Sequence, residues 1–165
     1  MSLNKITLHW TAGRNIPNDE EMKHYHFLID NKGLVYKGFY EPEANINVNG
    51  GKYAQHCGGG NTNNIGVAFC GCAVPKGIPV KNTKYPLTRV QLECGFKLCA
   101  ELCKKYNIPI DKAHVFTHYE FGLLHPNTSS AGKIDITYMH PFIAENKNTC
   151  GDFIRNKVRW YYKNL

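Results

Sequence analysis

Three short motifs in this chain carry side chains that suit metal-dependent hydrolysis. His9 lies in the motif LHWTAG, His118 lies in THYE, and Asp135 ends the tripeptide KID. Two imidazoles and one carboxylate can fill three corners of a zinc tetrahedron, and an open fourth corner for water distinguishes a catalytic zinc from a structural one. Lys133, two residues before Asp135, would add a cation beside that water or beside a developing oxyanion.

Predicted strands would position these motifs. Residues 5–10 are typical of a short strand that ends at a small Thr-Ala-Gly turn, and residues 65–70 form an apolar run typical of a buried central strand. Residues 25–30 and 34–39 predict a hairpin, because the Asn-Lys-Gly between them tolerates positive φ. Residues 115–116 belong to the strand that precedes the THYE motif.

Helices are predicted on either side of the last of these strands. Thr88 suits the N-cap of a helix over residues 88–106, and a basic amphipathic helix is predicted from about 151 to 163. Residues 14–24 have room for a turn or two of helix. The aromatic side chains of residues 160–162 are expected to pack against the domain rather than to form a platform for sugars.

The remaining segments predict loops around one folded unit. Residues 40–63, 71–87 and 119–137 are expected to be irregular, and long irregular stretches in a compact domain are usually functional. We expect an α/β fold with a central mixed β-sheet flanked by helices, in a single catalytic domain over residues 1–165.

Composition limits the partners and the compartment. The net charge of +7 suggests a polyanionic partner, but the basic residues are scattered and no nucleic-acid-binding motif is present. An anionic cell envelope suits the same surface, and solubility alone is the alternative explanation. The seven cysteines are odd in number, so mostly buried, reduced thiols are expected. No apolar run is long enough to insert into a membrane, and a monomer is expected.

Five motifs, in order, resemble the zinc-dependent N-acetylmuramoyl-L-alanine amidases of the type-2 amidase family. They read HWTA, YHFLID, HCGGGNTNNIGV, THYE and KID, and they span roughly residues 5–136. That family includes small amidase-type phage lysozymes and animal peptidoglycan-recognition proteins. The resemblance implies a Zn²⁺ hydrolase that cleaves the amide bond between N-acetylmuramic acid and L-alanine, in peptidoglycan or in a muropeptide.

The resemblance also implies roles for individual side chains. His9, His118 and Asp135 would ligate zinc, while Tyr25 and Lys133 would assist catalysis by holding the oxyanion or moving a proton. Many bacterial members carry a glutamate in the strand after the Asn-rich loop, where this chain has an alanine in the sequence IGVA. The tyrosine and the lysine are therefore expected to do the acid and base work.

Substrate contacts are expected from two loops. The resemblance implies that His56 and the loop around Asn61 line the glycopeptide groove. The Thr-Ala-Gly turn is small enough for substrate to approach, which makes Thr11 a further candidate contact.

Alternatives remain for single positions of this site. His114, His125 and Cys57 are rivals of Asp135 for the third ligand position. Glu120 is expected to be a solvated surface charge, and a carboxylate that supports a ligand histidine is the alternative.

Two biological interpretations follow from the sequence. The N-terminus lacks a signal-peptide pattern, so we expect cytoplasmic synthesis and a bacteriolytic phage or prophage endolysin that reaches the cell wall after holin-type release. The alternative is a non-catalytic peptidoglycan-recognition module. Such relatives typically lack a zinc ligand, whereas all three candidates are present in this chain.

Overall fold

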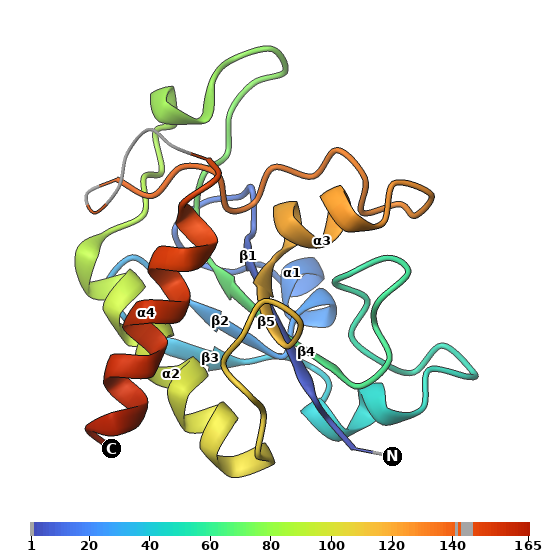
Figure 1. The fold of residues 1–165 in the computed structure, drawn as a ribbon. Helices are drawn as coiled ribbons and strands as arrows, with labels where there is room; N and C mark the ends of the chain where they lie inside the picture. The colour runs from blue at the N-terminus through green and yellow to red at the C-terminus, as the bar shows by residue number, and fades with distance from the viewer. Residues whose placement is uncertain (1, 141, 143–146) are drawn as a thin grey trace.

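A mixed β-sheet forms the centre of the computed structural model, which describes residues 2–140, 142 and 147–165 (Figure 1). Its strands are β1 (Lys5–Trp10), β2 (Phe27–Ile29), β3 (Val35–Lys37), β4 (Asn64–Phe69) and β5 (Val115–Thr117), and their spatial order is β3-β2-β4-β1-β5. The pairs β2–β4, β4–β1 and β1–β5 are parallel, whereas β3 runs antiparallel to β2 at one edge. The predicted α/β fold with a central mixed sheet is confirmed.

Helices flank this sheet. The α-helices among the described residues are α1 (Asp19–His24), α2 (Arg89–Tyr106), α3 (His118–Leu124) and α4 (Cys150–Lys163), and the 3-10 helices are η1 (Pro42–Ile46) and η2 (Val80–Asn82). Helices α2 and α4 pack against each other and cover one face of the sheet (Figure 1). No helix in the described part of the chain has the length and apolar character needed to cross a membrane.

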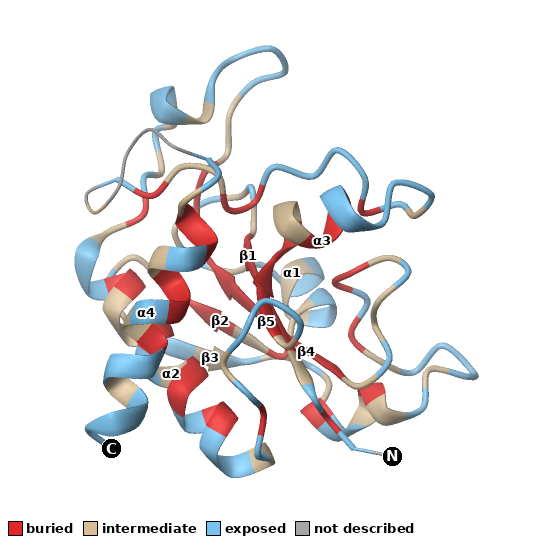
Figure 2. Ribbon diagram, viewed as in Figure 1, coloured by how far each residue is buried: buried red, intermediate tan, exposed pale blue. Residues whose placement is uncertain are grey.

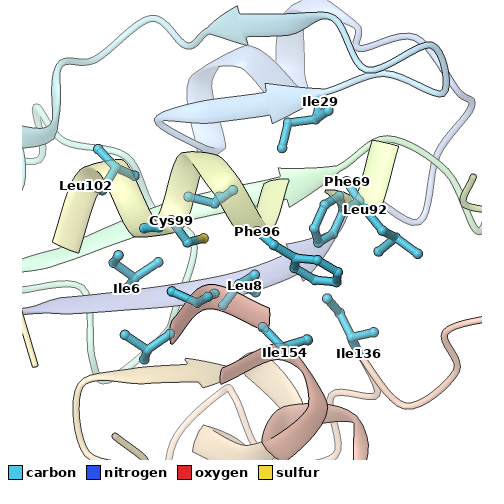
Figure 3. Close-up of a cluster of buried hydrophobic side chains, with 14 of the residues drawn as sticks. Ile6, Leu8, Ile29, Phe69, Leu92, Phe96, Cys99, Leu102, Ile136 and Ile154 are labelled. Atoms are coloured by element: carbon cyan, nitrogen blue, oxygen red, sulfur yellow. The ribbon is translucent and has the colours of Figure 1, made fainter. Parts of the chain in front are cut away.

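Alternation along β1 separates the hydrophobic core from the other face of the sheet. Ile6, Leu8 and Trp10 are buried in the main hydrophobic cluster. Figure 3 shows Ile6 and Leu8 within it. Each fully buried aliphatic side chain stabilises the fold by about 1.5–3 kcal/mol relative to exposure. Because successive side chains of a strand point to opposite faces, Thr7 and His9 point away from this core. Figure 2 shows that β1 and β4 are buried over almost their whole length, so both faces are covered.

Helix α2 begins and ends where the sequence predicts. Thr88 accepts a hydrogen bond from the Gln91 main chain, and the Gln91 side chain accepts one from the Thr88 main chain, which forms a capping box. Asn107 ends the helix in the left-handed conformation with φ of 56°. The capping box fixes the first turn of α2, and the rest of the helix then packs its apolar face on the core.

Three predictions about local structure need correction. Residues 119–137 are not wholly irregular, because α3 begins at His118 and continues to Leu124. The strands of the predicted hairpin are three residues each, shorter than expected, although main-chain hydrogen bonds from Asp30 to Leu34 and from Gly38 to His26 continue the pairing at both ends. Trp160 and Tyr162 are 58% and 40% exposed, so only Tyr161 of that aromatic group packs on the core as expected.

The cysteines are mostly buried in the core, as expected. Those with buried side chains are Cys57, Cys70, Cys72, Cys99, Cys103 and Cys150. Cys94 on α2 is half-buried. Burial raises the pKa of the Cys103 thiol to about 12, which keeps this side chain protonated at neutral pH.

Candidate metal centre and active-site pocket

Two histidines meet because their strands are parallel neighbours. His9 is near the carboxyl end of β1, and β5 ends at Thr117, immediately before His118. Parallel strands end at the same edge of a sheet, so both imidazoles reach one location. The Thr117 side chain and Glu120 form a capping box at the start of α3, which fixes the first turn that carries His118. The two rings lie with their centroids 4.6 Å apart.

Asp135 reaches the same place from a loop, and two contacts hold it there. Its main-chain oxygen accepts a hydrogen bond from Tyr119 at 2.6 Å, and the next side chain, Ile136, is fully buried in the core (Figure 3). Its carboxylate oxygens lie 2.9 Å from His9 Nδ1 and 3.4 Å from His118 Nδ1. These three buried side chains offer ligand atoms within 4.8 Å of one another, so they form a group that could hold a metal ion.

The hydrogen bonds of His9 and His56 determine which ring nitrogen of each carries the proton. His9 Nε2 lies 3.0 Å from His56 Nδ1, and His56 Nε2 lies 2.9 Å from the main-chain oxygen of Asn64. A carbonyl oxygen only accepts, so neutral His56 carries its proton on Nε2 and accepts from His9 Nε2–H. Burial, followed by the proximity of the His9 imidazole, lowers the pKa of His56 well below its ordinary value and keeps it neutral.

The donor set that results suits a cation. Neutral His9 then presents the lone pair of Nδ1 to the Asp135 carboxylate. Burial lowers the pKa of His9 although the nearby Asp135 carboxylate acts in the opposite direction, so a second proton on this imidazole is disfavoured. Burial alone would raise the pKa of Asp135, but contact with His118 and His9 outweighs burial and holds its pKa below the ordinary value. Nitrogen and carboxylate ligands around one point are the donors that Zn²⁺ prefers.

A pocket of about 580 Å³ opens over this group. Tyr25 and Lys133 both line it, together with His118 and Asp135, whereas the third candidate ligand, His9, is buried behind them. The Tyr25 ring lies 5.1 Å from the His9 ring, centroid to centroid. Burial and then the nearby charge of Asp135 raise the pKa of Tyr25, so its hydroxyl stays protonated and can donate a hydrogen bond. The arrangement therefore combines a cation site, a phenol donor and an exposed ammonium group.

The residues predicted to contact substrate also line this pocket, and each already makes hydrogen bonds within the protein. His56 is 6% exposed and is bonded on both nitrogens, as described above. Asn61 Oδ1 accepts from the main chains of His56 and Cys57, which shapes the glycine-rich loop. Thr11 Oγ1 accepts from Gly13 and Gly71. Contacts of these side chains with substrate stay predictions.

Rival ligands lie outside the candidate metal group. His114 is bonded to Asp111, and His125 stacks on Phe121 at 3.9 Å between ring centroids. Cys57 is fully buried, and its sulfur lies 3.9 Å from Ser130 Oγ.

Glu120 is not the solvated charge that its position predicted. Its two oxygens each lie 2.9 Å from the guanidinium of Arg155, whose side chain is 2% exposed. The pairing links α4 to the first turn of α3. Because Arg155 lies 35 residues from Glu120 in the sequence, no local pattern predicts their contact.

The structure adds Ser130, which sequence reasoning did not single out. Its hydroxyl lies 2.9 Å from His118 Nε2, and the residue is fully buried. Nothing in the polar segment around it distinguishes this serine from Ser129, because the contact depends on how the loop folds back.

Comparison with protein-family models matches residues 1–147 to a family described as N-acetylmuramoyl-L-alanine amidase. The matched region contains every candidate ligand and pocket residue discussed above, and α4 follows it. Among curated proteins the chain has no match.

Proposed function

The chain belongs to the N-acetylmuramoyl-L-alanine amidase family, which acts on peptidoglycan, and from this premise we propose a zinc-dependent hydrolase with the role of a phage or prophage endolysin. The observation that carries the proposal is the convergence of His9, His118 and Asp135 beside an open pocket, which His118 and Asp135 line. The net charge of +7 suits the anionic envelope on which such an enzyme would act.

The proposed reaction adds water to the amide carbonyl carbon and breaks its bond to the alanine nitrogen. The three ligand side chains would hold zinc, which when bound supplies a Lewis acid and lowers the pKa of water to about 7. The protonated Tyr25 hydroxyl donates to the carbonyl oxygen as negative charge develops there. The Lys133 ammonium lies at the same pocket and balances that charge. The hydroxyl of the attacking water stays on the carbonyl carbon, and the other proton of that water passes to the leaving nitrogen, so that alanine departs as a neutral amine.

Digestion of purified peptidoglycan tests this reaction. We expect new N-terminal alanine without new reducing ends, with activity lost in chelator and restored by Zn²⁺. His9→Ala and His118→Ala should lose the metal and the activity together. New reducing ends would identify a glycosidase instead, and a metal-free chain that still binds muropeptide would identify a recognition module.

A comparison of substrates tests the endolysin role separately. Intact sacculi and soluble muropeptides are digested in parallel, each with Zn²⁺ and with chelator. Faster cleavage of sacculi supports a lytic enzyme. Cleavage of muropeptides alone would retain the amidase and reject the endolysin role.

A further inference from the structure

The hydroxyl of Ser130 joins the candidate metal centre to the glycine-rich loop. Its Oγ lies 2.9 Å from His118 Nε2 and 2.7 Å from the main-chain oxygen of Gly58. A carbonyl oxygen only accepts hydrogen bonds, so the single hydroxyl proton of Ser130 is donated to Gly58. The serine oxygen is then left to accept from His118, which requires the imidazole to carry a proton on Nε2.

That proton position decides which nitrogen is offered to a metal. A neutral imidazole with its proton on Nε2 has its lone pair on Nδ1. In His118 this atom faces the Asp135 carboxylate at 3.4 Å. We propose that Ser130 is a positioning residue that fixes the proton and the ring orientation of His118, so that Nδ1 faces the metal. The inference rests on the metal centre of the proposed function.

The loop that carries Ser130 is packed tightly enough to hold the hydroxyl in one place. A Cβ at Gly122 on α3 would collide with the main chain of Ser130, and a Cβ at Gly58 would collide with the side chain of Ser129. The Ser130 main chain also donates to Thr128 Oγ1 at 3.3 Å. The serine is therefore held between α3 and the glycine-rich loop, and glycines on both sides permit the close approach.

The same hydroxyl connects two walls of the pocket. Gly58 and His118 both line the pocket, and they come from segments 60 residues apart that meet at Ser130. Removal of the hydroxyl leaves the Nε2–H of His118 and the Gly58 carbonyl without their partners. Groups that orient a metal-binding histidine typically change metal affinity 10–100-fold when they are removed.

Zn²⁺ titration of the metal-free full chain tests the role of Ser130. We expect Ser130→Ala to raise the Zn²⁺ dissociation constant about 10–100-fold. Ser130→Thr keeps the hydroxyl and should stay near the wild-type value. Thr88→Val is the matched control, because the Thr88 hydroxyl likewise donates to a main-chain oxygen, that of Asn31 at 2.6 Å, and accepts an N–H, but Thr88 does not line the pocket. It should lower the unfolding midpoint and leave the Zn²⁺ affinity unchanged.

Two results of the Zn²⁺ titration would overturn the inference. Equal Zn²⁺ affinity in Ser130→Ala and wild type rejects the role of Ser130 while the metal centre stands, whereas a wild-type chain that binds no Zn²⁺ rejects both. Nitrogen NMR of the metal-free wild type gives a reading that needs no variant. A proton on His118 Nε2 supports the inference, and a proton on Nδ1 overturns it.

Discussion

At the scale of single residues, Tyr25 and Lys133 line the pocket and are the side chains to which we assign its proposed acid and base chemistry. The β4 position where many bacterial relatives have a glutamate holds Ala68, which is fully buried and packs with Tyr25 in a small cluster. Asp135 is the one carboxylate among the residues that line the pocket, and it belongs to the candidate metal group. A separate carboxylate base is therefore lacking among these lining residues.

Removal of the Tyr25 hydroxyl should slow catalysis and spare the metal. Tyr25→Phe is expected to lower kcat about 10²–10⁴-fold with an unchanged zinc content, because the phenol acts on the substrate rather than on the ligands. Tyr36→Phe is the control, since the Tyr36 hydroxyl donates to Asp30 at 3.0 Å and Tyr36 is not among the pocket residues. A Tyr25→Phe enzyme with full kcat would contradict this role.

At the scale of elements, buried His26 ties β2 to β4 and to η1. Its Nδ1 accepts from the Gly66 main chain at 2.9 Å, and its Nε2 donates to Asn45 Oδ1 at 2.8 Å. Burial lowers the pKa of His26 from 6.5 to about 4, although the hydrogen bond with Asn45 partly opposes this change. The imidazole of His26 is therefore neutral in the folded protein, and each of its two nitrogens makes one hydrogen bond.

The free energy of unfolding should fall as the pH drops from about 6.5 to 4. In this window the unfolded chain binds a proton at His26 that the folded chain does not bind, so stability that is present above pH 6.5 is lost, by up to about 3 kcal/mol. Urea unfolding at several pH values measures it. His26→Gln should be less stable at pH 7 and should lose less on acidification. Identical pH slopes in the two proteins would refute this origin.

Strand β4 has a glycine where the His56 ring needs room. A Cβ at Gly66 would lie 2.6–2.9 Å from three atoms of that ring, which is held through both nitrogens. Gly66→Ala should therefore displace His56 from His9, destabilise the fold by about 1–3 kcal/mol and weaken Zn²⁺ binding. The double-mutant cycle with His56→Ala is the check. Gly66→Ala should reduce the free energy of unfolding much less when the His56 ring is absent. Additive effects of the two substitutions on that free energy would contradict the clash.

Sequence patterns predicted the elements well and the site only in part. β1, β4 and α2 follow from local periodicity and capping, and the sequence places His9 and His118 at strand ends. That these two ends share one sheet edge is a finding of the structure. The partner of each imidazole depends on loops that fold back across the sheet. Ser130 reaches His118 only because the intervening loop reverses, and the link from Arg155 to Glu120 spans 35 residues. No local pattern encodes such contacts.

At the scale of the whole molecule, α4 supports a site that it does not touch. The family match ends at residue 147, before this helix begins, yet Ile154 and Val158 of α4 are buried in the main core. The buried Arg155 binds Glu120, which caps the helix that begins with His118. The last helix therefore stabilises the position of one candidate ligand from the far side of the sheet.

Arg155→Met should destabilise the protein by about 3 kcal/mol or more, because Glu120 would lose its buried partner. Zn²⁺ affinity should fall with it, since the first turn of α3 would be less well fixed. Arg159→Met is the matched control on the same helix, where the guanidinium is exposed, and a change within about 0.5 kcal/mol is expected. Thermal unfolding and Zn²⁺ titration measure both effects, and equal losses in the two variants would contradict the argument.

The reaction rates of the buried thiols can be used to measure local unfolding of this protein. Burial raises the pKa of Cys57 to about 11 and those of Cys72 and Cys103 to about 12, and only a thiolate attacks a disulfide reagent. Each of them should be labelled at the rate at which its surroundings open, while half-buried Cys94 reacts first. Mass spectrometry after timed labelling would resolve the sites. Zn²⁺ should slow labelling of Cys57, next to Ser130, more than labelling of Cys103 on α2. The difference between the two labelling rates would show which part of the protein a bound metal ion protects from local opening.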